Sequence, residues 1–400
     1  MKKKVDPVVD EAIERLNMKD GPTRRRLLEG AGLFSATAAA SGLIAACTSS
    51  STSSAAPTAP PSVISTIGNF PKTPPWKFWF VNHVTTNLFF VPTIFGKNDA
   101  AALLGLPTPN WGGSAASLAA EMVADISTAI ASKANGIATT VINALPTDTT
   151  FTTPVAAAMS AGIPVVSYNA DGPIIKGVVT PGTNRLCYVG QALYVSGQQM
   201  GERIKANTKP GHVVIFIATP GTANIQPRFD GASSVLTPAG YTVSIVATGA
   251  STAVEGPPEK AYLLANKSNL VGAFAVDAGS TELLGPQLAA VGLAGKIYAG
   301  GFDLTPGTLA AIKAGQLDFT INQDPYLQGF LPTLYLYLYN LTGGLVLPPD
   351  TDTGLTFVDS ATVGTYLTSS TTYEGSTGAT KPSLVPRSGP IINPVASTST

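Results

Sequence analysis

The chain has 400 residues, of which 12% are charged, and its 24 basic and 24 acidic side chains cancel to a formal net charge of zero. So few charges offer no basic surface to a phosphate backbone, which argues against nucleic-acid binding. Two histidines and two cysteines make at most one Cys2His2 set with no ligand to spare, so we expect no cofactor and no metal, unless carboxylates alone hold one. The length exceeds what one hydrophobic core usually serves and favours two lobes.

The first 46 residues have the pattern of an export signal. Three arginines at 24–26 precede a weakly apolar stretch at 30–46, as in a twin-arginine signal. The sequence Ile-Ala-Ala-Cys, which ends at Cys47, is similar to a bacterial lipobox. We therefore expect the signal to be removed and Cys47 to be lipidated, which would anchor the protein on the extracytoplasmic face of the cell membrane. Secretion without a lipid and an uncleaved helix over about 27–46 are the alternatives.

Two segments of biased composition flank one globular body. Residues 47–75 are rich in Ser, Thr, Ala and Pro with almost no charge, a composition typical of a flexible tether. Residues 367–400 are similar and are expected to form a flexible tail. The body between them, at about 76–366, has Cys187 as its only thiol, so no disulfide can form within it.

The body alternates predicted strands and helices along the chain. In its first half the apolar patterns predict strands at 77–84, 136–142, 163–168 and 185–189, and helices at 91–104, 114–132 and 154–161. In its second half they predict strands at 212–218, 241–246, 270–276, 297–301 and 317–322, and helices at 195–207, 225–236, 258–265, 281–291, 306–314 and 326–341. Strands that alternate with helices form parallel sheets covered on both faces. We therefore predict an α/β fold of two doubly wound parallel-sheet lobes.

Polar and aromatic side chains gather where the predicted strands end. Because doubly wound sheets bind their ligands at the carboxyl ends of the strands, these residues are the candidates for a site. They are His83, Asn87, Phe89, Phe90, Tyr168, Asn169, Asp171, Arg228, Asp277, Asp303 and Gln323. Trp111, on a loop rich in Pro and Gly, is a further candidate as a lid. Planar polar groups beside flat apolar faces suit a neutral solute with many hydroxyls, and no serine or cysteine has an evident base partner.

Several candidates also have ordinary structural explanations. Asp277 and Asp303 could each cap a helix, since a carboxylate at that position accepts free backbone N–H groups. One of the two phenylalanines could belong to the core, Trp111 could pack on the surface, and His83 could satisfy a local hydrogen bond. The residues alone leave these alternatives open.

Five short motifs resemble the periplasmic binding proteins of the ribose type, the solute receptors of bacterial ABC sugar importers. The first two are Asn-Leu-Phe-Phe at 87–90, where the family has Asn-Pro-Phe-Phe, and Ile-Pro-Val-Val-Ser-Tyr-Asn at 163–169. The others are Gly-Thr at 221–222 with the following Arg228, Gly-Phe-Asp at 301–303, and Gln323. The resemblance covers the whole body and implies two such lobes joined by three crossovers.

The resemblance also implies roles for the matching residues. The residues expected to hydrogen-bond the solute are Asn87, Arg228, Asp303 and Gln323. The solute is expected to lie between the rings of Phe89 and Phe90. Asn169 stands where the family usually has an aspartate, and Asp277 where ribose binders have an asparagine. Ala170 replaces an arginine, which removes a charged partner worth about 1.5–3 kcal/mol unless Asp171 or another group replaces it. We therefore expect a sugar alcohol, another pentose or a hexose rather than ribose.

The family architecture implies how the lobes are connected and used. Crossovers near Gln191, Gln323 and Thr353 would give an N-terminal lobe of 76–190 plus 324–353 and a C-terminal lobe of 191–323 plus 354–366. A monomeric receptor without enzymatic activity would close over the solute and deliver it to an ABC permease. The alternatives are a sensor of a sugar or autoinducer, and a secreted carbohydrate hydrolase with Asp277 and Asp303 as its acid/base pair.

Overall fold

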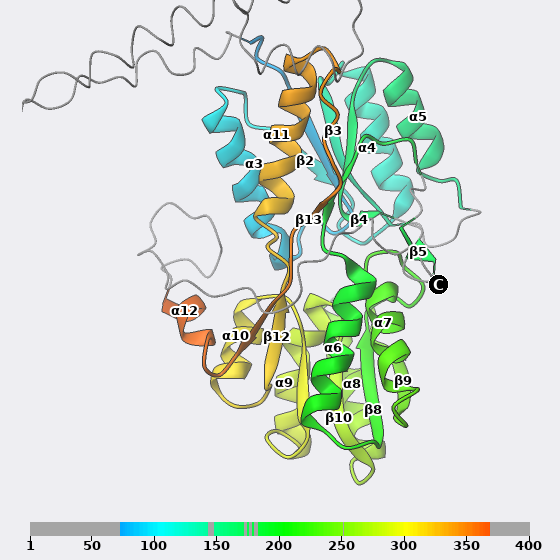
Figure 1. Cartoon of the computed structure of the whole chain (residues 1–400), viewed down its shortest axis with the longest axis vertical. Coiled ribbons are helices and arrows are strands. Elements are labelled where there is room, and N and C mark those ends of the chain that lie inside the picture. Colours follow the sequence, from blue (N-terminus) through cyan, green and yellow to red (C-terminus); the bar gives the residue numbers. More distant parts are fainter. Residues whose placement is uncertain are drawn as a thin grey trace, which may run out of the picture. The chain divides into compact units, whose positions relative to one another are not determined.

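The computed structural model describes residues 73–142, 148–171, 174–175, 178–179, 183–250 and 252–368. The predicted export signal, Cys47, most of the tether and nearly all of the tail lie outside the described residues. Within them the chain forms two six-stranded sheets, each covered by helices on both faces (Figure 1). This arrangement confirms the predicted α/β fold with two doubly wound lobes.

The first sheet has the strand order β13-β7-β4-β3-β1-β2, and all of its pairs are parallel. Its strands are β1 (Phe78–Asn82), β2 (Asn110–Gly113), β3 (Gly136–Val141), β4 (Val165–Asp171), β7 (Tyr188–Gly190) and β13 (Thr351–Asp352). Helices α3 (Val91–Leu103) and α11 (Leu327–Leu341) cover one face, and α4 (Ala119–Ala131) and α5 (Thr152–Ser160) cover the other. A 3-10 turn, η2 (Leu88–Phe90), precedes α3, and β5 (Ile174–Ile175) pairs with β6 (Val178–Val179).

The second sheet has the order β14-β12-β11-β10-β8-β9. Its parallel strands are β8 (His212–Ile217), β9 (Thr242–Ala247), β10 (Leu270–Ala275), β11 (Tyr298–Phe302) and β12 (Phe319–Asn322), and β14 (Thr356–Asp359) pairs antiparallel with β12. Helices α6 (Leu193–Asn207) and α7 (Gln226–Leu236) cover one face. Helices α8 (Thr252–Asn266), α9 (Ala278–Val291) and α10 (Pro306–Lys313) cover the other, and α12 (Val363–Thr368) packs on α10.

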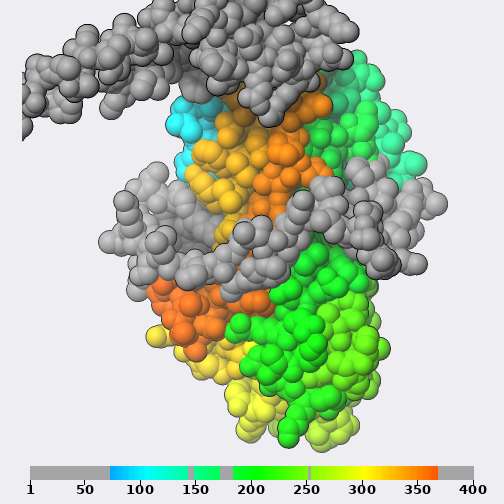
Figure 2. All heavy atoms as spheres, in the orientation of Figure 1, coloured from blue at the N-terminus to red at the C-terminus, as the bar shows by residue number. Residues whose placement is uncertain are grey.

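The chain passes from one sheet to the other three times. It leaves the first sheet after β7 to enter α6, returns after β12 to enter α11, and passes again from β13 to β14. In the space-filling view, the yellow-orange α11 of the first lobe and the green α6 of the second are both seen on the same side (Figure 2). Each sheet face and its helices enclose one hydrophobic cluster. Within the described ranges, no helix combines the length and the apolar character that a bilayer span requires.

Several short elements differ from the sequence prediction. Strands β2, β5, β6, β13 and β14 and helix α12 are not predicted, because two to six residues carry too little periodicity to be recognised. The prediction that Trp111 lies on a loop is therefore wrong, since this residue lies in β2. Helix α4 begins later than predicted, because the Ser114 side chain accepts hydrogen bonds from the N–H groups of Ala116 and Leu118 in a turn before the helix.

Two glycines set the position of the helix that carries Arg228. A Cβ atom on Gly197 of α6 would lie 2.1 Å from the backbone oxygen of Arg228, and one on Gly231 of α7 would lie 2.0 Å from that of Tyr194. Only glycine permits so close an approach between these two helices. The backbone of α7 is thus fixed at the point where its arginine enters the site.

Candidate functional site

A hollow with about 360 Å³ of space free of protein atoms lies where the carboxyl ends of strands from both sheets meet. We call it the first hollow. Nine of the twelve side chains predicted from the sequence line it: His83, Asn87, Phe89, Phe90, Asn169, Arg228, Asp277, Asp303 and Gln323. Asn224, Ile225 and Ala278 complete the lining and are not among the predicted residues. The structure thus brings most of the predicted set together in one place.

Arg228 is held by protein groups on one side and lacks a partner on the other. Only 2% exposed, it donates from Nη1 to the backbone oxygen of Val276 (2.9 Å) and from Nη2 to Oε1 of Gln191 (3.1 Å). Its guanidinium carbon lies 4.2 Å from the centre of the Phe302 ring. The Nε atom is buried without a hydrogen-bond partner among the described residues. Because a buried unpaired donor is costly, this N–H suits an oxygen acceptor of a bound solute.

A chain of hydrogen bonds joins Asp303 of the second lobe to Asn169 of the first. Gln323 donates from Nε2 to Oδ1 of Asp303 (2.6 Å) and accepts at Oε1 from Nε2 of Gln328 (3.1 Å). Gln328 in turn accepts at Oε1 from Nδ2 of Asn169 (3.0 Å). Burial raises the pKa of Asp303 to about 6, partly opposed by the Arg228 charge. Gln328 was not predicted; its only sequence signal is a polar residue at the start of an otherwise apolar helix.

The backbone at two lining residues is strained. Asn169 has a φ of 60° and Asp303 a φ of 78°, both in the left-handed region that residues other than glycine rarely adopt. At Asn169 the strain coincides with an irregularity in the pairing of β3 with β4. Asn and Asp tolerate this conformation better than other residues, and strained residues are concentrated at functional sites.

Asp277 acts as the N-cap of α9, as the structural alternative predicted. Its Oδ1 accepts from the backbone N of Ser280 (2.9 Å), and its Oδ2 accepts from the backbone N of Ala218 (2.8 Å) and from the Ser280 hydroxyl (3.0 Å). Burial raises the pKa of this carboxyl, whereas these hydrogen bonds lower it. Asp277 lines the hollow, but both of its oxygens already serve the fold.

Phe89 and Phe90 contact each other rather than face each other across a gap. Their ring centres are 4.7 Å apart and their planes are inclined by 80°, so the space lies beside the pair and not between the two rings. The expected sandwich is therefore wrong for this arrangement. Asn87 caps the turn that carries both rings, because its Oδ1 accepts from the backbone N of Phe89 (2.9 Å).

His83 contacts the second lobe across the first hollow. Its Nδ1 lies 3.2 Å from Oγ1 of Thr140, and its Nε2 lies 3.3 Å from Nδ2 of Asn224. Burial lowers the pKa of the imidazole to about 4, so it is neutral at neutral pH. The local hydrogen bond expected as the alternative is present, and His83 also lines the hollow. Asn224 has a weak sequence signal, since it precedes Arg228 by four residues.

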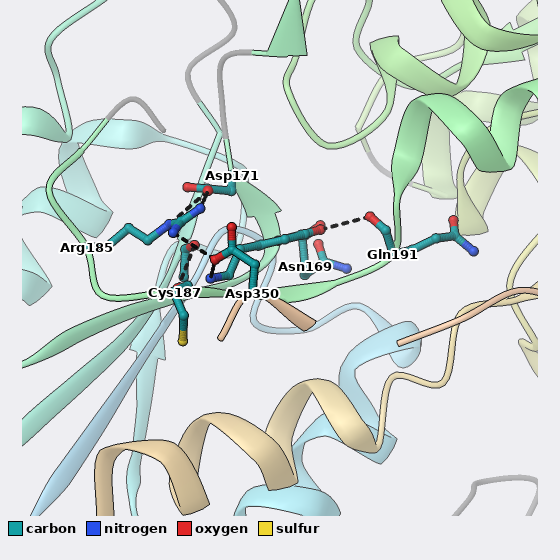
Figure 3. A network of polar contacts seen from close by, with 8 residues as sticks. Asn169, Asp171, Arg185, Cys187, Gln191 and Asp350 are labelled. Atoms are coloured by element: carbon teal, nitrogen blue, oxygen red, sulfur yellow. Dashed lines mark hydrogen bonds and ion pairs between the residues drawn. The ribbon is translucent and has the colours of Figure 1, made fainter. Parts of the chain in front are cut away.

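Three predicted site residues lie outside the hollow. Tyr168 is fully buried in the core, where its hydroxyl accepts from Nδ2 of Asn82 (2.9 Å). Trp111 packs behind Phe90, with ring centres 6.2 Å apart, and supports that ring instead of forming a lid. Asp171 accepts from Nε of Arg185 (2.9 Å), and Figure 3 shows Arg185 between Asp171 and Asp350. Asp171 therefore cannot replace the arginine missing at Ala170.

In the part of the chain that the structure describes, the remaining reactive groups give no sign of a metal or nucleophile site. Within the described ranges no three His, Cys, Asp or Glu side chains are grouped so as to hold a metal ion. Cys187 is fully buried, and burial raises the pKa of its thiol to about 12. Such a thiol is unreactive at neutral pH.

Comparison with known proteins agrees with this architecture. Residues 78–342 match the family model described as periplasmic binding protein domain. A xylose/arabinose-binding protein of Sulfolobus acidocaldarius is 46% identical over 334 residues, which cover 81% of each chain. An ABC transporter solute-binding protein from Burkholderia graminis, solved with D-arabinose, has a TM-score of 0.63 at 25% identity and covers 72% of this chain and 96% of its own. A carbohydrate transporter from Acidothermus cellulolyticus, solved with myo-inositol, has a TM-score of 0.61 at 25% identity, covering 73% and 96%. The chain belongs to the periplasmic binding protein family.

Proposed function

We propose that this protein is an extracytoplasmic receptor that binds one neutral sugar or sugar alcohol in the first hollow and delivers it to an ABC importer. The proposal rests on the side chains that line the first hollow together. Arg228, whose buried Nε has no hydrogen-bond partner among the described residues, and Asp303 lie there with the rings of Phe89 and Phe90. A sugar hydroxyl can accept from the guanidinium and donate to the carboxylate, while the apolar face of its ring packs on an aromatic ring. These three features together fit a neutral ring with several hydroxyls.

The named ligands of the relatives narrow the class of solute. A 46% identical relative is a xylose/arabinose-binding protein, and two solved neighbours hold D-arabinose and myo-inositol. We infer that the solute is a pentose such as xylose or arabinose, or a polyol of similar size. Ribose binders have an arginine at the position of Ala170, and the nearby Arg185 is bound to Asp171. No guanidinium from this part of the chain is therefore free to bind a sugar, which supports our inference that ribose is not the main solute.

The solute would leave the protein chemically unchanged. A glycoside hydrolase of the usual kind needs two carboxyl groups available to act as acid and base or nucleophile. Both oxygens of Asp277 accept hydrogen bonds from protein groups, which leaves Asp303 without a second free carboxyl in the first hollow. Binding without turnover is therefore the better explanation of the site.

The proposal extends to regions that the structure does not describe. We propose that the segment before Cys47 directs export and that Cys47 carries a lipid, so that a monomeric receptor is tethered near its permease at a raised effective concentration.

We further propose that the N-terminal lobe comprises 76–190 plus 324–353 and the C-terminal lobe 191–323 plus 354–366. The solute contacts both lobes only when they are closed, and so it shifts the population toward the closed form.

A thermal-shift screen followed by titration calorimetry tests the proposal. We expect D-xylose, L-arabinose or D-arabinose to raise the melting temperature, because a ligand stabilises the folded state more strongly the further its concentration exceeds Kd. D-Ribose, xylitol and myo-inositol define the selectivity, and magnetic resonance spectra of the sugars after incubation report any turnover. The absence of a shift with every pentose, hexose and polyol, or a chemical change in a bound sugar, would refute the proposed function.

A further inference from the structure

A second hollow adjoins the first and is of similar size. It contains about 460 Å³ free of protein atoms, against about 360 Å³ in the first. Six residues line both: His83, Asn87, Asn224, Ile225, Asp277 and Ala278. Further lining comes from both lobes, including Ser117 from the first and Thr222 and Glu255 from the second. The two hollows therefore adjoin along a shared wall between the lobes.

Glu255 is a buried carboxyl that faces the second hollow without a protein partner for one oxygen. The residue is 3% exposed, and its Oε2 has no hydrogen-bond partner among the described residues. It packs on Gly279 so closely that a Cβ atom there would lie 2.2 Å from Oε2 and 2.5 Å from Oε1. A buried carboxyl oxygen without a donor is unfavourable. Because Glu255 lines the second hollow, a ligand bound there can supply this donor.

The chemistry of the second hollow suits hydroxyl groups. No lysine or arginine is among the side chains that line it. Burial, with the charges of Asp277 and Glu282, raises the pKa of Glu255 to about 8, so the group is mostly a neutral acid at neutral pH. A neutral carboxyl can both donate to and accept from a hydroxyl. Ser117 from the first lobe and Thr222 and Asn224 from the second offer further neutral partners.

We propose that the second hollow is a subsite for a second sugar unit, so that the receptor takes a disaccharide as well as a single sugar. One unit occupies the first hollow, and a hydroxyl of the other donates to Oε2 of Glu255. The inference rests on the proposed function, because the second unit is covalently linked to the sugar that the first hollow binds. It goes beyond that function in assigning Glu255 to recognition and in doubling the size of the solute.

Titration calorimetry with the full chain tests this subsite, with D-xylose and its disaccharide xylobiose as probes. We expect Glu255→Leu to weaken xylobiose binding about tenfold, the effect of losing one hydrogen bond, and to leave D-xylose within about twofold. Ala250→Phe should have the same selective effect, because Ala250 is exposed and lines only the second hollow. Glu259→Leu is the matched control. Glu259 lies on the same helix and is fully buried without a partner among the described residues, but it lines neither hollow.

The outcomes separate the subsite from the proposed function. Selective loss of xylobiose affinity in both variants, with Glu259→Leu unchanged, supports the subsite. Binding of D-xylose without xylobiose, or xylobiose affinity that neither variant changes, overturns it and leaves the proposed function standing. Binding of glucosamine that depends on Glu255, without binding of xylobiose, overturns it in favour of an ammonium site. If Glu255→Leu does not fold, Ala250→Phe decides alone.

Discussion

At the scale of single residues, Arg228 contributes to both the fold and the site. Its two terminal nitrogens bind Val276 and Gln191, its plane lies on Phe302, and its Nε remains for the solute. A lysine keeps the charge but cannot make planar contacts in several directions. We expect Arg228→Lys to weaken sugar binding by about 10–100-fold, as for the loss of a charged hydrogen bond. Calorimetry measures this loss.

Arg203 provides the matched control for that substitution. It also stacks on aromatic rings, with its guanidinium carbon 5.0 Å from the centre of Phe319 and 4.6 Å from that of Phe357. It lines neither hollow, so Arg203→Lys should cost stability without changing Kd. Equal affinity losses in the two variants would mean that Arg228 acts only through the fold.

Asp303 makes sugar binding dependent on pH. Burial raises the pKa of its carboxyl to about 6. A sugar hydroxyl that donates to the ionised form stabilises it, so affinity should fall by up to about tenfold per pH unit as the pH drops below about 6. Asp303→Asn should flatten this dependence, because the amide does not titrate. A wild-type Kd that stays constant between about pH 4 and 8 would contradict the assigned role.

The stability of the ligand-free protein should respond to pH in the opposite sense. A folded-state pKa raised above the unfolded value of about 4 contributes stability that is complete below that value and is lost as the pH rises through about 6. Relative to the wild type, Asp303→Asn should therefore gain up to roughly 3 kcal/mol between about pH 4 and 7. Melting temperatures of both proteins across this range report the difference.

The sequence predicts residues of the site well where a strand ends and the backbone turns. Asp303 and Gln323 follow β11 and β12 directly and line the first hollow. Prediction fails inside β4, which continues to Asp171 and not to Tyr168, so that Tyr168 lies in the core. Only the tertiary pairing of β4 with β3 and β7 fixes where this strand stops, and no local pattern contains that information.

At the scale of elements, helix α11 connects the site to two of the passages between the sheets. Its Gln328 is fully buried and bonds Asn169 in the first hollow. It also donates to the backbone oxygen of Gln323 (3.2 Å) and to Oγ1 of Thr353 (3.2 Å). The Gln328 side chain thus binds Asn169 in the first hollow, Gln323 in the segment between β12 and α11, and Thr353 in the segment between β13 and β14.

Replacement of this glutamine should disturb the site without touching the solute. Gln328→Leu leaves buried groups of Asn169 and Gln323 without a partner, and we expect about tenfold weaker sugar binding together with a lower melting temperature. Thr333→Val on the same helix is the control, because the fully buried Thr333 hydroxyl donates to the backbone oxygen of Gly329 within that helix and Thr333 lines neither hollow. It should lower stability alone. An equal loss of stability in both variants with unchanged Kd would reduce Gln328 to a structural role.

Long helices and central strands follow from periodicity, whereas the starts of helices α4 and α8 do not. Helix α3 and strand β8 agree with the sequence prediction within one residue at each end. Helix α8 begins at Thr252 although Pro257 and Pro258 lie inside it. Two prolines favour a later start, but the packing of α8 against α9 outweighs this local preference.

At the scale of the whole molecule, the two lobes touch beside the first hollow. Nε2 of His83 lies 3.3 Å from Nδ2 of Asn224, and the backbone N of Ala223 donates to the backbone oxygen of Ile142 (3.3 Å). Both contacts join the end of a strand in the first sheet to the loop after β8 in the second. Both contacts are between neutral groups, so they favour closure only weakly by themselves. A solute bound by Arg228 and Asn87 would add contacts to both lobes at once.

Closure should therefore depend on the sugar and be visible in solution. We expect the radius of gyration from small-angle X-ray scattering to fall when D-xylose is added to the wild type, because the ligand shifts the population toward the closed form. Asn224→Ala removes one interlobe contact, so it should need several times more sugar to reach the same closed curve. Arg228→Lys should stay open at sugar concentrations that close the wild type. Superimposable wild-type curves with and without a sugar that calorimetry shows to bind would mean that the lobes do not move, and recognition by a permease would then need another signal.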